Sequence, residues 1–336
     1  MNIGLMLIFL LVLLGPLLMK KVEENLEMFL LAMGVLACVV SGVYSDKLFL
    51  VAATDPIYIS VAVLVAGLVF KQLQRPMSHA IRFIKRKTPF RIFVFFMILL
   101  LGLISSVITA IIAALILVVI VKELGLNKHN TTLLTVLSCF SIGLGAALTP
   151  IGEPLSIVTI SKLNEDFFFL VRLLGTDIGF ALLIFAVVGA VLVKDTPDEL
   201  LRLREKIPTE SYQDILVRGL KIYFFVMGLT FLGAGFEPFV STYFLELDPS
   251  VLYWSNMSSA ILDNATLAAA EISPDLDPSA VHIILMGLMI SGGMLVPGNI
   301  PNIIAAGKLG ISSKDWAKVG LPIGLSIMML YYLILF

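Results

Sequence analysis

Two acidic residues lie in apolar surroundings, and they are the strongest candidates for chemistry in this sequence. Glu153 lies in the segment TPIGEP, and Asp263 lies in the segment SSAILDNAT, with no other charge before Glu271. An ionised carboxylate inside a bilayer costs several kcal/mol, so it must be neutralised by a proton, a cation or a partner. Because one carboxylate can hold a proton or a metal ion but not both, we expect it to exchange protons for cations. Either acid could instead lie at a helix end that faces water.

Oxygen-bearing side chains accompany both acids in the sequence. Amide and hydroxyl oxygens, together with carboxylates, are the ligands that hard cations such as Na⁺ prefer. Glu153 and Asp263 are the predicted Na⁺ ligands. The full predicted ion- or substrate-binding set is Glu153, Asp263, Asn264, Thr266, Thr149, Ser156, Asn299, Asn302, Ser105, Ser106, Ser258 and Ser259.

The same segments allow a second interpretation, in which the transported ligand is an anion. Helices that begin at Gly152 and Gly298 would present free backbone amides, and helix N-termini favour negative charge. Serines of the predicted hairpins could then bind carboxylate groups, while Asp263 would hold a coupling Na⁺. Both interpretations stay open at the level of the sequence.

Glu153 must be held by an interrupted helix. Pro150, Gly152 and Pro154 surround it between two apolar halves, and proline removes a backbone donor and clashes with the preceding turn. In hydrocarbon, unpaired backbone groups are tolerated only where they are buried in protein or line a cavity. A break that carries a carboxylate is therefore typical of an ion or substrate site in a transporter.

The break is repeated near the C-terminus. The sequence of residues 152–163 aligns with that of residues 298–309 without a gap, at an offset of 146 residues. Upstream, residues 105–108 (SSVI) resemble residues 258–261 (SSAI), at an offset of 153 residues. Two similarities in the same order indicate a duplicated unit, which is typical of secondary transporters.

The composition is that of an integral membrane protein. Of the 336 residues, 59% are hydrophobic and only 14% are charged, with a mean hydropathy of +1.03. Apolar runs of about 20 residues predict helices rather than a barrel. The net charge of −1 gives no indication of nucleic-acid binding. Cys38 and Cys139 are expected to be packing residues, the three histidines lack metal-ligand spacing, and no cofactor is expected.

The predicted fold is an all-α polytopic membrane protein with about eight transmembrane helices and two re-entrant hairpins. The hairpins are expected at residues 92–121 and 251–272. The spans are expected at residues 2–18, 26–44, 48–70, 131–163, 171–193, 222–240, 282–311 and 319–336, the fourth and seventh being broken helices.

Charge asymmetry predicts the topology. Residues 71–91 contain seven basic residues and no acid, and the connector 194–221 is also rich in bases. The positive-inside rule makes both segments cytoplasmic, with the basic segment partly along the membrane surface, and it leaves both termini outside a cell membrane. The two hairpins then enter from opposite sides, as inverted repeats require.

These features divide the chain into four parts. Residues 1–91 form scaffold helices and the basic loop, and residues 92–193 form the first repeat. Residues 194–221 form the connector, and residues 222–336 form the second repeat.

Three motifs resemble a known superfamily. The segment Thr149–Pro154 resembles the TPIG signature of the ion transporter superfamily, and Ser259–Asn264 resembles the hairpin signature of NhaD-type sodium/proton antiporters. The residues Pro297–Asn299, together with Pro301 and Asn302, resemble the second broken helix of those antiporters and of the arsenite-efflux ArsB group. The branch of predicted cation transporters is the most similar.

This resemblance implies a transport domain, a scaffold, elevator-like movement and a homodimer. It also implies that Glu153 and Asp263 bind the ion and the proton. The chain departs from an even duplication at two places. Thr109 and Ala110 stand where the second hairpin has Asp263 and Asn264, and Asn299 stands where the first break has Glu153.

We therefore expect a secondary active transporter with Na⁺/proton antiport ahead of Na⁺-coupled uptake of a dicarboxylate or oxyanion. An enzyme is not expected, because the sequence contains neither the GxGD motif of intramembrane aspartyl proteases nor the GxSxG motif of rhomboid-like serine proteases. A channel is a third possibility, although it would not need two carboxylate-bearing segments in inverted repeats.

Overall fold

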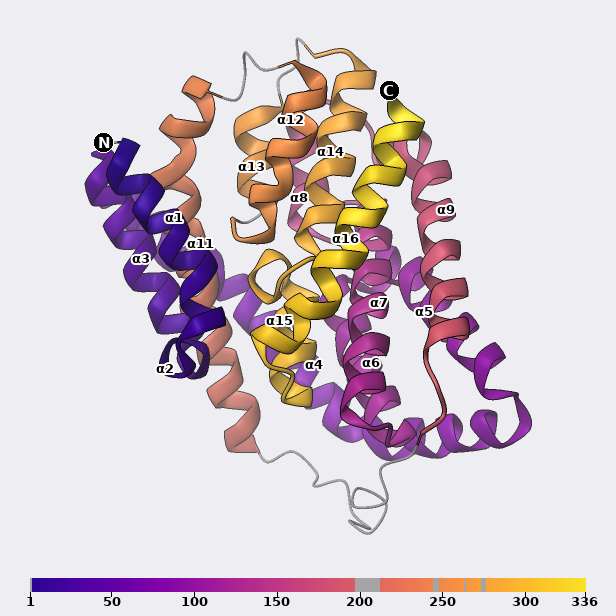
Figure 1. Ribbon diagram of the computed structural model, residues 1–336. Coiled ribbons are helices and arrows are strands. Elements are labelled where there is room, and N and C mark those ends of the chain that lie inside the picture. Colours follow the sequence, from indigo (N-terminus) through magenta and orange to yellow (C-terminus); the bar gives the residue numbers. More distant parts are fainter. Residues whose placement is uncertain (1, 197–211, 244–247, 263, 273–275) are drawn as a thin grey trace.

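A computed structural model describes residues 2–196, 212–243, 248–262, 264–272 and 276–336. These ranges form helices and connecting turns, with no strand among them. Both termini lie at the upper end of the molecule as drawn in Figure 1. Part of the predicted connector and the predicted ligand Asp263 lie outside the described residues.

Several helices of the described chain suit a membrane. By length and composition, four could cross one, and they cover Phe90–Ile108, Phe169–Leu192, Ile215–Phe239 and Ser313–Leu335. Shorter apolar helices lie at Ile3–Pro16, Leu26–Ser41, Pro154–Leu163 and Pro278–Gly292. The all-helical, apolar architecture predicted from composition is thus present. The expected span count and the side on which each end lies remain predictions.

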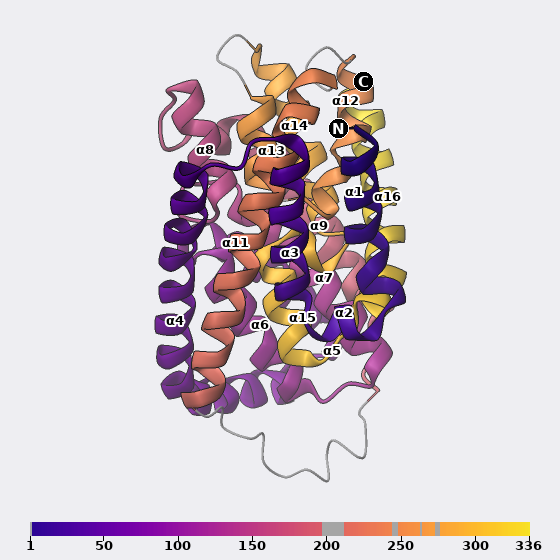
Figure 2. The same ribbon diagram turned by 90° about the vertical axis from the view of Figure 1, so that its left-hand side faces the viewer.

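The first structural unit, called the outer unit here, contains α1 (Asn2–Leu18), α2 (Lys20–Glu24), α3 (Leu26–Ser41), α4 (Asp46–Lys87) and α11 (Tyr212–Tyr243). Its α1, α2, α3, α11 and the first part of α4 lie along one side of the molecule (Figures 1 and 2), and the rest of α4 runs along the lower end.

Small residues let α3 and α11 pack backbone to backbone. A Cβ on Gly34 would lie 2.5 Å from the carbonyl oxygen of Gly228, and one on Gly228 would lie 2.6 Å from the amide nitrogen of Leu31. Such close approach between apolar helices is a common packing mode in membranes. The thiol of the buried Cys38 donates to the carbonyl oxygen of Phe231 at 3.0 Å, so this cysteine packs as expected.

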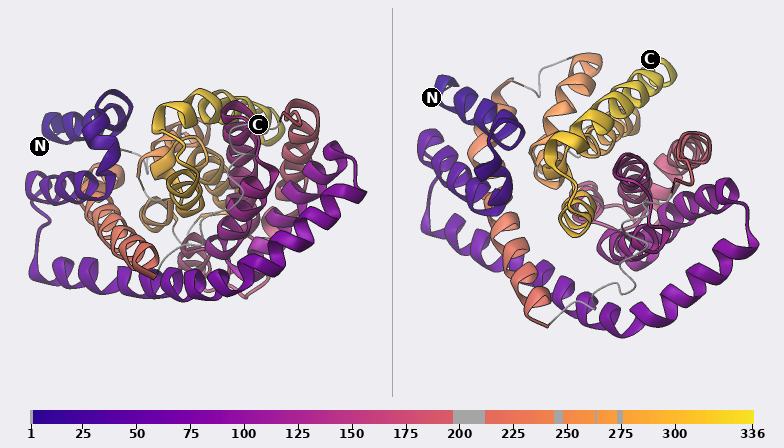
Figure 3. Two further views of the ribbon diagram at one scale, coloured as in Figure 1. Left: turned by 90° about the horizontal axis from the view of Figure 1, so that it is seen from below. Right: turned by 60° about the horizontal axis from the view of Figure 1, so that its bottom comes forward.

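Helix α4 continues past the predicted end of the third span. The expected span over residues 48–70 and most of the basic segment over residues 71–91 lie in one helix, Asp46–Lys87. It descends beside α11 and then runs along the lower end of the molecule (Figures 2 and 3). Hydropathy falls after residue 70 while the helix continues, with Pro76 inside it. The membrane boundary at residue 70 remains a prediction.

The second structural unit, called the inner unit, begins with α5 (Phe90–Ile108), α6 (Ala110–Leu124), α7 (Lys128–Ala146), α8 (Pro154–Leu163) and α9 (Phe169–Leu192). α5 rises from the lower end and α6 returns there, so the two form a helical hairpin with its tip in the middle of the molecule (Figure 1). α7 then rises to the middle, and α8 continues to the upper end after a break.

The rest of the inner unit has the opposite direction. It contains α12 (Pro249–Ser255), η1 (Asn256–Ala260), α13 (Asn264–Glu271), α14 (Pro278–Gly292), η2 (Val296–Gly298), α15 (Ile300–Leu309) and α16 (Ser313–Leu335). The second hairpin, α12–η1 and α13, descends from the upper end and returns to it (Figure 1). α14 descends to the middle, and α15 continues to the lower end. Both helix interruptions occur where the prolines predict them.

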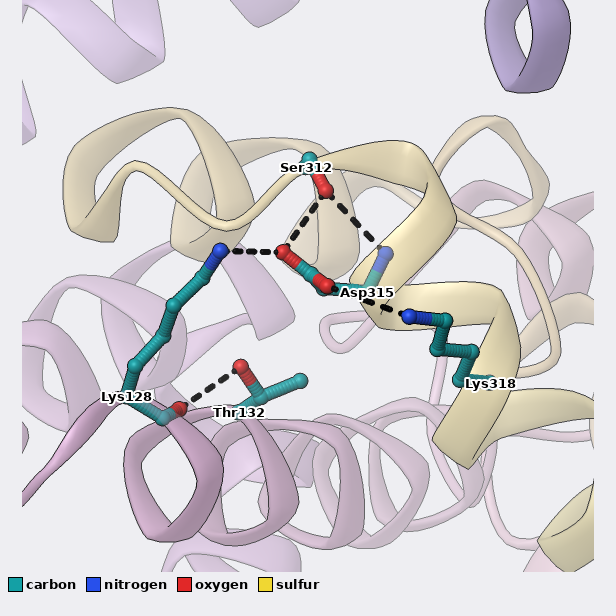
Figure 4. Close-up of polar contacts among 5 residues, drawn as sticks. All are labelled: Lys128, Thr132, Ser312, Asp315 and Lys318. Carbon is teal, nitrogen blue, oxygen red and sulfur yellow. Dashed lines mark hydrogen bonds and ion pairs between the residues drawn. The ribbon is translucent and has the colours of Figure 1, made fainter.

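A polar cluster joins the starts of α7 and α16 at the lower end (Figure 4). Nζ of Lys128 lies 2.6 Å from Oδ2 of Asp315, and Nζ of Lys318 lies 3.9 Å from Oδ1. The hydroxyl of Ser312 donates to Oδ2 of Asp315 at 2.8 Å and accepts from the amide of Asp315 at 3.1 Å. Ser312 is therefore an N-cap that also positions the acid bridging the two helices.

We expect Ser312→Ala to lower the free energy of unfolding by about 1 kcal/mol, because the N-terminal amide of α16 loses its acceptor. Lys128→Met should cost less, since this lysine side chain is 74% exposed and such pairs contribute about 0–1 kcal/mol. Thermal unfolding of the purified protein in detergent measures both. A larger loss for Lys128→Met would contradict this ranking.

Candidate functional site

A small cavity lies where the two hairpins and the two helix breaks meet. Its volume is about 60 Å³, and one water molecule needs about 10–15 Å³ of such space. The cavity can therefore hold a few water molecules or a partly hydrated ion. Its lining residues are Ala110, Ile111, Gly152, Glu153, Pro154, Leu229, Asn264, Pro297, Gly298, Asn299 and Ile300.

The first hairpin closes onto the first break through backbone contacts. Thr109 forms the tip with a positive φ of 75°, and its hydroxyl accepts from the amide of Ile112 at 3.4 Å. The amide of Ala110 donates to the carbonyl oxygen of Gly152 at 3.1 Å. The hydroxyl of Thr149 donates to the carbonyl oxygen of Ser106. The tip and the break are thus held together where helical hydrogen bonding stops.

Glu153 lies at the start of α8 and faces the cavity. It is the N-cap residue, with φ of −156° and ψ of 160°, and Pro154 is the first helical residue. Its side chain makes no capping hydrogen bond and is 7% exposed. The position combines a buried carboxylate with the positive end of a helix dipole, which favours negative charge.

Asn299 has the equivalent place in the second break. It is the N-cap of α15, with φ of −155° and ψ of 145°, close to the values of Glu153. It is 9% exposed and also lines the cavity. The two breaks therefore have similar backbone geometry, with a carboxylate in one and an amide in the other.

Two predicted ligands also hold the breaks closed. The hydroxyl of Ser156 donates to the carbonyl oxygen of Ala147 at 2.8 Å. At the equivalent position, the amide of Asn302 donates to the carbonyl oxygens of Gly292 and Leu295, both at 2.9 Å. These bonds satisfy carbonyls that the interrupted helices leave without a backbone donor.

We expect Asn302→Leu to destabilise the protein by about 2–4 kcal/mol, because two buried carbonyls lose their donor at about 1–3 kcal/mol each. Asn25→Ala is the control, since its exposed amide bonds to Lys21 near the surface. Thermal unfolding in detergent compares the two variants. Equal melting temperatures would show that Asn302 does not support the break.

Two hairpin serines hold the hairpins against the broken helices. The hydroxyl of Ser105 donates to the carbonyl oxygen of Ile142 at 2.9 Å, and that of Ser259 donates to the carbonyl oxygen of Leu288 at 2.9 Å. Ile142 and Leu288 are 146 residues apart, whereas Ser105 and Ser259 are 154 apart. The structural equivalence of the hairpins is therefore displaced by one residue from the alignment that the sequence suggested.

The remaining predicted residues have different places. The hydroxyl of Ser106 donates to the carbonyl oxygen of Leu103 at 2.8 Å, while that of Ser258 is buried without a hydrogen-bond partner in the described chain. Asn264 begins α13 and lines the cavity. Thr266 lies in α13, but its side chain, like the whole of Asp263, lies outside the described residues.

Sequence reasoning missed the contribution of the outer unit. Leu229 of α11 lines the cavity, so the site lies at the boundary between the two units. It also missed a pair near the upper end, where Nε2 of His282 lies 2.8 Å from Oδ2 of Asp177 without hydrogen-bond alignment. Nothing in the sequence indicated either contact.

The donor set consists of oxygen atoms from Glu153, Asn264 and Asn299, together with backbone groups of the breaks. No group of three or more His, Cys, Asp or Glu side chains that could hold a metal ion occurs among the described residues. One carboxylate with neutral oxygens suits a monovalent hard cation or a proton.

The family described as "Protein of unknown function (DUF1646)" matches residues 2–336. The chain belongs to this family. The match covers both structural units and therefore the whole site. A comparison with curated proteins finds no match.

Proposed function

We propose that the chain is a secondary active transporter that exchanges cations, with Na⁺ as the first candidate, for protons. The observation that carries the proposal is the cavity at which both hairpins, both helix breaks and the buried Glu153 converge. Broken helices at mid-membrane that meet hairpins of opposite direction are typical of transporter sites.

The arrangement of the two units supports alternating access. The inner unit holds every cavity residue except Leu229, which belongs to α11 of the outer unit. Movement of the inner unit along the outer one would carry Glu153 towards either end of the molecule. We therefore propose an elevator-type movement in which the hairpins are re-entrant, the basic part of α4 faces the cytoplasm and the transporter is a homodimer.

Hydrogen bonding at the site favours a cation over an anion. The hydroxyls of Ser105, Ser106, Thr149, Ser156 and Ser259 all donate to backbone carbonyls. Their protons are already used, so these five predicted residues leave no hydroxyl donor for an anion, and none of the five lines the cavity itself. The cavity volume of about 60 Å³ also suits an ion, since sites for organic ligands are several-fold larger.

A second candidate function is Na⁺-coupled transport of an organic or inorganic anion. It is supported by the N-termini of α8 and α15, which begin at Pro154 and Ile300, both on the cavity wall. Two helix N-termini that face one cavity favour negative charge. Glu153 opposes this alternative, because a second negative charge at the same place would repel the anion.

The test is proton movement by the purified protein in liposomes that contain a pH-sensitive dye. Addition of Na⁺, Li⁺ or K⁺ outside should make the lumen alkaline, and the responding cation is the transported one. Under the same conditions Asp263→Asn should give no response, as the sequence predicts for a coupling acid. Uptake of a labelled dicarboxylate or oxyanion under a Na⁺ gradient, with no pH response, would instead establish the anion alternative.

A further inference from the structure

Hairpin 2, formed by α12, η1 and α13, contains a second buried carboxyl that the cavity does not use. Glu271 is the last residue of α13 and is 1% exposed. The side chain that interacts with its carboxyl is Asn256, the first residue of η1, which is completely buried. The pair therefore joins the two arms of the hairpin.

Three oxygen atoms of this pair have no hydrogen-bond donor. Within the described chain, neither carboxyl oxygen of Glu271 nor Oδ1 of Asn256 makes a hydrogen bond. Nδ2 of Asn256 donates to the carbonyl oxygen of Ile284 at 3.4 Å. Buried acceptors without a donor are costly, and a buried carboxylate that carries a charge is costlier still. A proton on Glu271 removes that charge.

No positive charge from the neighbouring elements pairs with Glu271. On α8, Nζ of Lys162 donates to the carbonyl oxygen of Ile272 at 3.3 Å, and on α14, His282 faces Asp177. Glu237 on α11 is exposed and negative. None of the ion pairs between described residues includes Glu271. A buried carboxylate in that situation would be uncompensated, so the neutral acid is strongly favoured.

The first hairpin lacks this pair. With the structural offset of 154 residues, the positions of Asn256 and Glu271 correspond to Gly102 and Leu117. Leu117 is completely buried, so the first hairpin packs with an apolar side chain at the position that corresponds to Glu271. Hairpin packing therefore does not require a carboxyl here, and the acid is an addition specific to hairpin 2.

We propose that Glu271 is a second proton-binding site of this protein, in which the neutral carboxyl lies beside Asn256. Binding of the proton follows from burial and the missing donor and does not depend on transport. Its role as a carried proton rests on the proposed antiport. Hairpin 2 is the element that would expose or shield the carboxyl when the site opens.

Infrared spectroscopy of the protein in lipid tests proton binding directly. The wild type should show a carbonyl-stretch band of a protonated carboxyl at neutral pH that is lost in Glu271→Gln. Glu237→Gln is the matched control and should keep the band. Asn256→Leu should keep it but move it to higher frequency, because the acid loses its polar neighbour. Identical spectra for the wild type and Glu271→Gln would overturn the proposal.

The liposome assay then tests whether this proton is carried. Glu271→Gln should lower the number of protons moved per cation relative to the wild type and Glu237→Gln, and an unchanged ratio would overturn the transport role. If no cation drives proton movement in the wild type, the proposed antiport fails, while the infrared band still decides whether Glu271 holds a proton.

Discussion

Glu153→Gln should reduce cation-driven proton movement in liposomes to the level of protein-free vesicles. Glutamine keeps the size of the side chain and its oxygen, but it cannot bind or release a proton. Because Glu153 is the buried acid that lines the cavity in the described chain, antiport without it has no proton to exchange there. The measurement is the dye response to a cation gradient, with the amount of inserted protein determined for each sample.

Glu165→Gln is the control for this experiment, since Glu165 is an exposed acid in the turn after α8. It should transport like the wild type. Thermal unfolding of Glu153→Gln in detergent, compared with the wild type, shows whether the variant is folded. A Glu153→Gln protein that keeps full pH-dependent exchange would refute the proposed role of this acid.

Gly145→Ala should destabilise the protein more than any other single methyl addition discussed here. A Cβ at this position would lie 1.8 Å from the carbonyl oxygen of Gly102 and 2.9 Å from the hydroxyl of Ser105. The nearest atom is backbone, so α5 and α7 must separate and the hydrogen bond from Ser105 to Ile142 must lengthen. Overpacking of this kind costs about 1–3 kcal/mol and sometimes more.

Gly307→Ala provides the matched comparison, because nothing lies within 4 Å of a Cβ at that helical glycine. Alanine is favoured over glycine within helices by about 1 kcal/mol, so this variant should be as stable as the wild type or more stable. Thermal unfolding in detergent and the yield of monodisperse protein measure both. A Gly145→Ala protein as stable as Gly307→Ala would contradict the close packing of α5 on α7.

Local chemistry made several features predictable from the sequence. Prolines at 150, 154, 297 and 301 cannot donate within a helix, and the structure interrupts both helices there. The apolar segment over residues 92–121 was too long for one span, and it forms two helices joined at Thr109. Glu153 was predicted as a buried acid because its apolar flanks leave it no local route to water, and it is buried.

Other features depend on properties that hydropathy does not report. The polar residues after position 70 end the apolar run, yet many of them are good helix formers, and α4 continues to Lys87. Similarly, the sequence alignment pairs Ser105 with Ser258. The hydrogen bonds to Ile142 and Leu288 instead make Ser105 equivalent to Ser259. Register depends on which serine reaches the facing helix.

The sequence was thus sufficient for the helical class, the two breaks and the acid at the first break, because each depends on residues close together in the chain. Contacts between distant segments decided the rest. They direct the hydroxyls of Ser156 and Ser259 to backbone carbonyls, bring Leu229 to the cavity and enclose Glu271 with Asn256. A hydroxyl or carboxyl can bond to any neighbour within reach, and only tertiary packing determines which neighbour that is.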